Sequence, residues 1–252
     1  TGWDVPVETG KVTKGNLDSW VRTNTGGLVK GSGLTVTPDM KLVLQNAIIF
    51  AAKWLVPFKA DDTIKYDFTK ADGTVTEVDM MWLFQHHGPY IASDGWQGVR
   101  LDYTDEELSA FVLIPDADLG EVTPTKLRQA LSRLVTAQEQ TAILKVGLPK
   151  FKLTTSKDFK GFFTHVGLGE EAALTKMTDL PTKIIQAVQQ AFIVVDEEGT
   201  VAGAVTEVGG AMATPMTGDI TIIADRPFYF IVGDAKTATP LFFSHVGDPT
   251  KG

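Results

Sequence analysis

The sequence predicts a mixed α+β protein built mainly from antiparallel strands. Short runs rich in Val, Ile and Phe recur along the chain and end at turn residues, which is typical of strands. A hairpin turn is indicated at Ala71-Asp72-Gly73, and few stretches space their apolar residues as a helix does. The 252 residues could form one large domain or two small ones. No internal repeat or linker is evident, so we expect a single domain over 1–252.

The expected elements follow in chain order. Helices are predicted where apolar residues recur at helical spacing, at 11–21, 123–140 and 158–165. Strands are predicted where apolar runs stop at Gly, Pro or Asp, at 3–7, 41–50, 63–79 (a hairpin), 90–93, 97–103, 108–115, 142–148, 228–232 and 241–246.

The stretch 187–230 organises the chain. An apolar run at 191–195 stops at the acidic turn 196–199, and small residues with a single Glu then lead to a second apolar strand. At period two, one face holds Thr200, Ala202, Ala204, Thr206 and Val208, whereas the other holds Val201, Gly203, Val205 and Glu207. Because the charge lies on one face only, this segment can be a loop outside the fold or a strand inside a sheet.

The turn Asp196-Glu197-Glu198-Gly199 has two interpretations. By itself it fits an ordinary hairpin turn. As a hinge, it would use Gly199 to tolerate a positive φ, and its acidic pair would stay soluble outside the sheet. Small residues after it would lower the barrier to threading between two strands.

Composition argues against several function classes. With 23 basic and 31 acidic residues the chain lacks the positive charge of a nucleic-acid-binding protein. No apolar run approaches the ~18–20 residues of a membrane span, so we expect no nucleic acid and no membrane as partner. Cysteine is absent and no Asn-x-Ser/Thr sequon occurs, which suits a bacterial protein.

No enzyme, cofactor or metal site is expected. The chain has no nucleophile elbow, and its glycines lack the strand–loop–helix context of a phosphate cradle. Adjacent histidines on a strand point to opposite faces, so they do not converge on a metal. We therefore interpret the four histidines as structural or surface residues: His86, His87, His165 and His245.

Several motifs together resemble the serpins, a family of protease inhibitors with a mobile reactive loop. The residues 197–200 with Ala202 and Ala204 resemble the family's hinge, and 222–232 resembles its C-terminal signature. Further matches in family order are Asn46-Ala47-Ile48-Ile49-Phe50 with Lys53-Trp54, then Asn16, Trp20, Val21, Thr25 and Gly27, then Leu148-Pro149-Lys150-Phe151, and Pro240-Leu241-Phe242-Phe243.

The resemblance implies a serpin-like fold with large, mostly antiparallel sheets and a suicide mechanism. A target serine protease would cleave the loop and be trapped as an acyl-enzyme while the loop inserts into the main sheet. The hinge would be Glu197, Glu198, Gly199, Thr200, Ala202 and Ala204, and the sheet would open at Asn46, Trp54 and Gln189. Counting seventeen residues from Glu197 places the scissile bond at Ala213-Thr214, with Met216-Thr217 as the alternative. Either bond suits an elastase-like enzyme.

The chain also departs from the family pattern. Serpins exceed 300 residues, so the resemblance implies the C-terminal two-thirds of the fold, without the N-terminal helices. Such a sheet would expose strand edges, which makes loop–sheet self-association possible. Gln189 replaces the usual His opposite Asn46. The alternatives are therefore a non-inhibitory serpin-like binding protein and an inactive fragment. The resemblance favours an extracellular or cell-surface location, although no secretion signal opens this chain.

Overall fold

A computed structural model describes residues 10–38, 40, 43, 45, 50–116, 120–137, 142–158, 160–165, 186, 188–200 and 220–251. The chain divides into two compact units. The smaller unit comprises Thr1–Ile49 and Leu153–Phe192, and the larger one comprises Phe50–Lys152 and Ile193–Gly252. The single domain expected over 1–252 stays a prediction.

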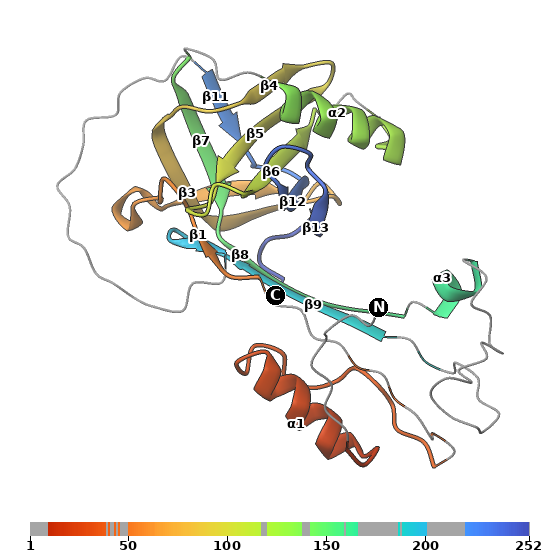
Figure 1. The fold of residues 1–252 in the computed structure, drawn as a ribbon. Coiled ribbons are helices and arrows are strands. Elements are labelled where there is room, and N and C mark those ends of the chain that lie inside the picture. Colours follow the sequence, from red (N-terminus) through yellow and green to blue (C-terminus); the bar gives the residue numbers. More distant parts are fainter. Residues whose placement is uncertain are drawn as a thin grey trace. The chain divides into compact units, whose positions relative to one another are not determined.

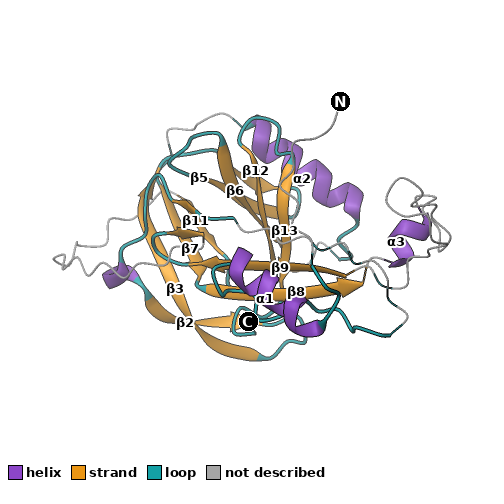
Figure 2. Cartoon of the chain, turned by 60° about the horizontal axis from the view of Figure 1, so that its bottom comes forward, coloured by secondary structure: helices purple, strands orange, loops and turns teal. Residues whose placement is uncertain are grey.

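The larger unit contains a five-stranded antiparallel sheet with the order β13-β12-β6-β5-β4. Its strands are β4 (Tyr90–Ser93), β5 (Trp96–Asp102), β6 (Leu108–Pro115), β12 (Phe228–Asp234) and β13 (Pro240–Val246). Helix α2 (Pro124–Thr136) packs on this sheet, as Figure 2 shows, and its Leu134 is buried against Phe111 and Ile231. The helix begins at the cap Thr123, whose hydroxyl accepts a hydrogen bond from the Lys126 amide.

A four-stranded sheet with the order β11-β7-β3-β2 forms a second layer of this unit. Its strands are β2 (Ile64–Thr69), β3 (Val75–His86), β7 (Leu144–Pro149) and β11 (Ile220–Ile223), and a 3₁₀ turn, η1 (Ala60–Asp62), precedes β2. β11 runs parallel to β7, whereas the other pairs are antiparallel. Edge-to-face ring contacts join the buried Phe68, Phe151, Phe228 and Phe230, an arrangement that aromatic pairs favour.

A third sheet has the order β1-β10-β9-β8. β1 (Ala52–Lys53) and β10 (Gly199–Thr200) are two-residue strands of the larger unit, and β8 (Phe151–Asp158) and β9 (Val188–Val195) are long strands that lie side by side in Figure 1. β10 therefore lies between β1 and β9, directly after the turn that follows β9.

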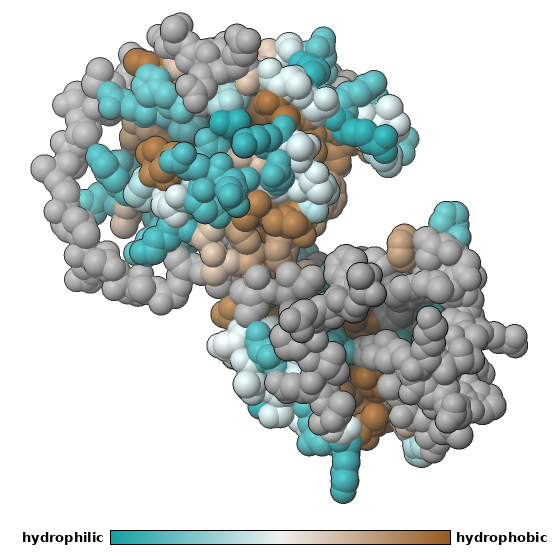
Figure 3. Space-filling model, in the orientation of Figure 1, coloured by the Kyte–Doolittle hydropathy of each residue, from teal (hydrophilic) through white to brown (hydrophobic). Residues whose placement is uncertain are grey.

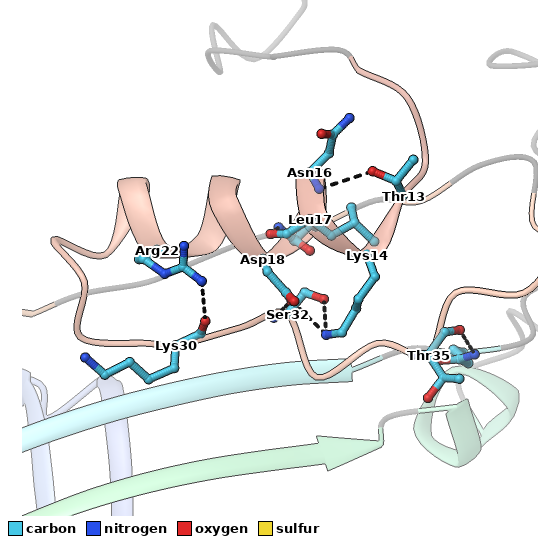
Figure 4. Close-up of polar contacts among 11 residues, drawn as sticks. Thr13, Lys14, Asn16, Leu17, Asp18, Arg22, Lys30, Ser32 and Thr35 are labelled. Carbon is cyan, nitrogen blue, oxygen red and sulfur yellow. Dashed lines mark hydrogen bonds and ion pairs between the residues drawn. The ribbon is translucent and has the colours of Figure 1, made fainter.

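The smaller unit carries helix α1 (Lys14–Asn24) and a short helix, α3 (Lys160–His165). Thr13 caps α1, because its hydroxyl accepts from the Asn16 amide at 3.2 Å (Figure 4). Gly26 and Gly27 both have positive φ and end the helical path. None of the helices in the described part of the chain is long and apolar enough to cross a membrane.

Most predicted elements are confirmed, with corrections at their ends. α1 begins three residues later than predicted and runs on to Asn24, whereas α2 ends at Thr136, four residues before the predicted end at 140, because Ala137 has an extended backbone. The helix predicted from 158 was wrong at its start, because β8 continues through Asp158 and α3 begins at Lys160. The sequence did not predict β8 as a long strand or the parallel pairing of β11. The strand at 3–7 lies outside the described residues.

Large hydrophobic side chains also lie on the surface of the larger unit. Figure 3 shows such residues as brown patches among hydrophilic ones. Those at least 47% exposed in this unit are Leu55, Val56, Ile64, Val75, Leu241 and Phe243. Leu241 and Phe243 belong to β13, the outermost strand of its sheet.

Candidate functional site

The turn after β9 is closed by its own hydrogen bonds. The Asp196 amide donates to the Gly199 carbonyl at 3.0 Å, and the Asp196 carboxylate accepts from the amides of Glu198 and Gly199 at 3.0 and 3.2 Å. Burial raises the pKa of Asp196, while these two amide hydrogen bonds oppose that rise. An aspartate that accepts from the next backbone amides is a common way to stabilise a tight turn.

The segment that follows β1 fixes this turn from outside. The Trp54 indole donates to the Asp196 carbonyl at 2.9 Å, and the Trp54 amide donates to the Glu198 carbonyl at 2.9 Å. The Phe58 amide donates to the Glu197 carbonyl at 3.0 Å. The segment 54–58 thus donates hydrogen bonds to three consecutive carbonyls of the turn. These bonds hold the turn in place within the larger unit.

An ion pair holds the first acidic side chain of the turn. The Lys150 ammonium lies 2.7 and 3.0 Å from the two carboxylate oxygens of Glu197, and the Thr63 hydroxyl donates to one of them at 2.8 Å. The Glu197 side chain is only 16% exposed. Burial by itself would raise the pKa of Glu197, but the hydrogen bonds from Lys150 and Thr63 lower it below the ordinary value. The expectation that both glutamates are solvated is therefore wrong for Glu197.

Gly199 is required by a close backbone approach. A Cβ atom built on this residue would overlap the carbonyl oxygen of Ala52 and lie 2.9 Å from the Lys53 Cα. Its φ is not positive, unlike that of Gly26, Gly27 and Gly73. The predicted reason for glycine, a left-handed conformation, is thus wrong, because β1 leaves no room for a side chain at this position.

Thr200 is fully buried beneath aromatic rings. Its hydroxyl and that of Tyr103 lie 2.7 Å apart, and neither residue is exposed. The Trp54 ring stacks on Tyr103 at 4.7 Å between centroids, and Phe50 meets the same ring edge-on at 5.1 Å. Burial raises the pKa of Tyr103 well above its ordinary value, so the phenol stays protonated and available as a hydrogen-bond donor.

The strand pairing shows where Gly199 and Thr200 lie in the third sheet. Thr200 lies opposite Ala52 of β1 and opposite Val195 of β9, and Gly199 lies opposite Lys53. β10 therefore begins a strand between β1 and β9, antiparallel to both. The buried side of Thr200 belongs to the uncharged face predicted from the period-two pattern.

The structure brings together only part of the predicted site. Glu197, Glu198, Gly199, Thr200 and Trp54 gather around the turn, whereas Gln189 is exposed on β9. The remaining predicted positions lie outside the described residues: Asn46, Ala202, Ala204, Ala213, Thr214, Met216 and Thr217. Their predicted roles, including the pairing of Asn46 with Gln189, stay predictions.

Three residues that hold the turn were not predicted as site residues: Thr63, Tyr103 and Lys150. Lys150 belongs to a motif that resembles the serpins, and no contact with the turn was predicted for it. An acidic turn next to a buried strand nevertheless needs a counter-ion, which was the available signal. Nothing in the sequence near Tyr103 points to Thr200, which is 97 residues away.

The histidines give no indication of a metal centre. In the described part of the chain no three His, Asp or Glu side chains gather as a metal would require. His86 is 7% exposed, and its Nε2 lies 3.1 Å from the Arg100 carbonyl. Burial lowers the pKa of His86, and the Arg100 carbonyl partly opposes this shift.

Three mostly antiparallel sheets with few helices define an α+β fold that solved structures of serpins share. Thyroxine-binding globulin in complex with thyroxine matches with a TM-score of 0.76 and 24% identity, over 94% of this chain and 65% of that one. Serpin48 of the insect Tenebrio molitor matches with a TM-score of 0.72 and 26% identity, over 93% and 64%.

Sequence comparison identifies the family. Residues 5–249 match the family model of the serpins, the serine protease inhibitors, so the chain belongs to the serpin family. A serpin-like protein of Methanosarcina mazei is 28% identical over 94% of this chain and 58% of its own length. One of fowlpox virus is 31% identical over 90% and 66%, and rat alpha-1-antiproteinase is 29% identical over 93% and 58%. The chain thus spans roughly three-fifths of the curated relatives it matches.

Proposed function

We propose that this chain inhibits serine proteases as a suicide pseudo-substrate. A protease cleaves the connection between β10 and β11, and the freed residues extend β10 as a full strand between β1 and β9. The observation that supports this most is the position of β10, since Thr200 is already buried between these two strands.

The energetics favour such an extension. About a dozen new backbone hydrogen bonds would contribute on the order of 10 kcal/mol at roughly 0.5–1.5 kcal/mol each. Buried apolar side chains would add about 25 cal/mol per Å². This gain is comparable to the free energy of unfolding of a docked protease, which is ~5–15 kcal/mol. The inserting strand can therefore distort the bound protease before the acyl bond is hydrolysed.

The proposed scissile bond is Ala213-Thr214, with Met216-Thr217 as the alternative. Ala and Met are small or medium apolar residues, so the proposed target is an elastase-like serine protease rather than a trypsin-like enzyme. The mass of the C-terminal fragment released by elastase distinguishes the two bonds.

The test is to mix the chain with elastase and run a denaturing gel. We expect a covalent complex with the wild type and only cleaved product with Ala202→Arg, because insertion would bury an unpaired guanidinium at a cost of several kcal/mol. A complex that persists unchanged in Ala202→Arg would contradict the proposed role of the hinge. Plain cleavage of the folded wild type would identify a substrate, and loss of the folded circular dichroism signal would identify a fragment.

A second candidate is a non-inhibitory binding protein. The observation that favours it is a hollow of about 750 Å³ between α2 and the β12–β13 pair, lined mainly by apolar side chains such as Leu127, Leu131 and Phe243. Thyroxine-binding globulin was solved in complex with thyroxine, although at 24% identity the likeness to this chain concerns the fold alone. Small residues after Gly199 favour the inhibitor, because a hinge that never inserts has no need of them.

A further inference from the structure

The strand β11 begins where the connection that follows β10 ends. Its first residue is Ile220, and it pairs in parallel with β7, so that Thr221 lies opposite Lys145. β7 in turn pairs with β3, in which Trp82 lies opposite Gly147. The strands β11, β7 and β3 lie side by side in Figure 1. Side chains of β7 and β3 are therefore close neighbours of the point at which the cleavable connection ends.

One face of this sheet carries a cluster of aromatic rings. Opposed residues share a face and alternate residues point the same way, so Trp82, Phe84 and Lys145 lie on one face. The Trp82 ring stacks on Phe84 at 6.2 Å between centroids, and Tyr66 of β2 meets it edge-on at 5.7 Å. Gly147 leaves room for this ring, because a Cβ atom there would lie 3.0 Å from two of its atoms. The rings are thus held in place on the sheet.

The Lys145 ammonium is held over these rings. It lies 4.4 Å from the centroid of Trp82 and 5.3 Å from that of Phe84, within the distance at which a ring face attracts a cation. Lys65, on β2 of the same sheet, lies 2.9 Å from the Asp79 carboxylate. Lys145 has no such carboxylate partner among the residues that the structure describes, and its side chain is half-buried. The cluster therefore presents a fixed positive charge with unused N–H donors.

A protease that cleaves the connection must come close to this charge. Thr214, which follows the proposed scissile bond, precedes Ile220 by six positions, and six residues span about 20 Å at most. Even a small domain is about 30 Å across, so a protease whose cleft holds the bond extends as far as the start of β11. Lys145 lies on the C-terminal side of the bond, because its neighbour in the sheet is Thr221.

We propose that Lys145 is a docking contact for the target protease outside its catalytic cleft. An acidic side chain of the protease, beside the part of the cleft that takes the residues after the scissile bond, pairs with the ammonium. Phe84, which is half-buried beside Lys145, adds apolar contact. The inference rests on the proposed function, since the partner is the protease that cleaves the connection. The contact precedes cleavage, so it governs the rate of encounter rather than the insertion of β10.

The test measures binding of the intact chain to an elastase whose catalytic serine is replaced by alanine, so that no bond is cleaved. Lys145→Met keeps the apolar stem over the rings but removes the charge, and we expect it to lower the association rate constant about threefold or more at ~0.1 M salt. At ~1 M salt, where charges are screened within about 3 Å, wild type and variant should bind alike. Lys145→Arg should bind like the wild type, and Lys145→Glu more slowly than Lys145→Met.

The matched control is Lys65→Met, which removes the same charge from the same sheet. Its ammonium is already paired with Asp79, so binding should not change. A Lys145→Met chain that associates like the wild type at the lower salt concentration, or a wild type that does not bind the inactive elastase, would overturn the docking contact. Active elastase tests the proposed function separately. A chain that docks through Lys145 but forms no covalent complex would refute trapping and leave the docking contact standing.

Discussion

Replacing Gly199 with alanine tests the close approach on which the hinge depends. The added Cβ would overlap the Ala52 carbonyl oxygen and lie 2.9 Å from the Lys53 Cα, and backbone atoms cannot move aside as a flexible side chain can. Overpacking of this kind costs about 1–3 kcal/mol. Displacing β10 would also weaken the Trp54–Glu198 backbone hydrogen bond and the contact of Thr200 with Tyr103, worth roughly 1 kcal/mol each.

We therefore expect Gly199→Ala to destabilise the intact chain by about 3–5 kcal/mol, which lowers the melting temperature by roughly 6–20 °C for a chain of this size. The assay is thermal unfolding followed by circular dichroism, with complex formation against elastase measured in parallel. Gly15→Ala is the matched control, because its Cβ meets no atom within 4 Å and it lies in α1, where alanine is favoured by about 1 kcal/mol. A Gly199→Ala protein that melts with the wild type would refute the close approach.

Three further substitutions test the rest of the site and one buried histidine. Lys150→Met should lower the free energy of unfolding by about 1 kcal/mol, since the ion pair is partly screened by solvent. Because the pKa of Glu197 is lowered, the stability difference between wild type and variant should be complete above pH 4.5 and vanish as the pH falls further. Melting curves at several pH values would show this. Tyr103→Phe should lower stability in urea by about 1–3 kcal/mol by leaving the Thr200 hydroxyl unpaired, and Thr200→Val in the same protein should restore most of it; no recovery would contradict the hydrogen bond. His86 has a lowered pKa, so wild-type stability should fall as the pH drops below 6.5, whereas His86→Gln should show less of this fall; parallel pH profiles would exclude His86 as the cause.

Local sequence signals predicted much of the larger unit. The hairpin around Gly73 forms as expected, with φ of 81° at the glycine and the Asp72 carboxylate accepting from the Thr74 amide. β6 has the predicted bounds, and α2 begins one residue after its predicted start at 123. These elements are specified by residues close together in the chain, so a single sequence contains the information.

Nonlocal pairing explains most of what the sequence did not predict. β11 pairs in parallel with β7, some seventy residues earlier, and the residues of neither strand identify the other as its partner. The Glu197–Lys150 ion pair joins residues 47 apart, and the Tyr103–Thr200 contact joins residues 97 apart. The period-two pattern did predict which face of the hinge is uncharged, and Thr200, on that face, is buried. Pattern alone could show that a strand is possible there, but not which side chains would receive it.

Because the turn is held in place, substitutions in the hinge should fall into two groups: those that destabilise both the intact and the clipped chain, and those that destabilise the clipped chain alone. Three carbonyls of residues 196–198 are held by the segment 54–58, and Lys150 holds Glu197, so the turn has no reason to move when β10 lengthens. Substitutions of Lys150 or Gly199 should therefore destabilise the intact and the clipped chain alike. Substitutions beyond Thr200 should spare the intact chain and act on the clipped one. If Lys150→Met instead lowered the melting temperature of the clipped form alone, the turn would be part of the moving strand, and Thr200 would not mark the start of insertion.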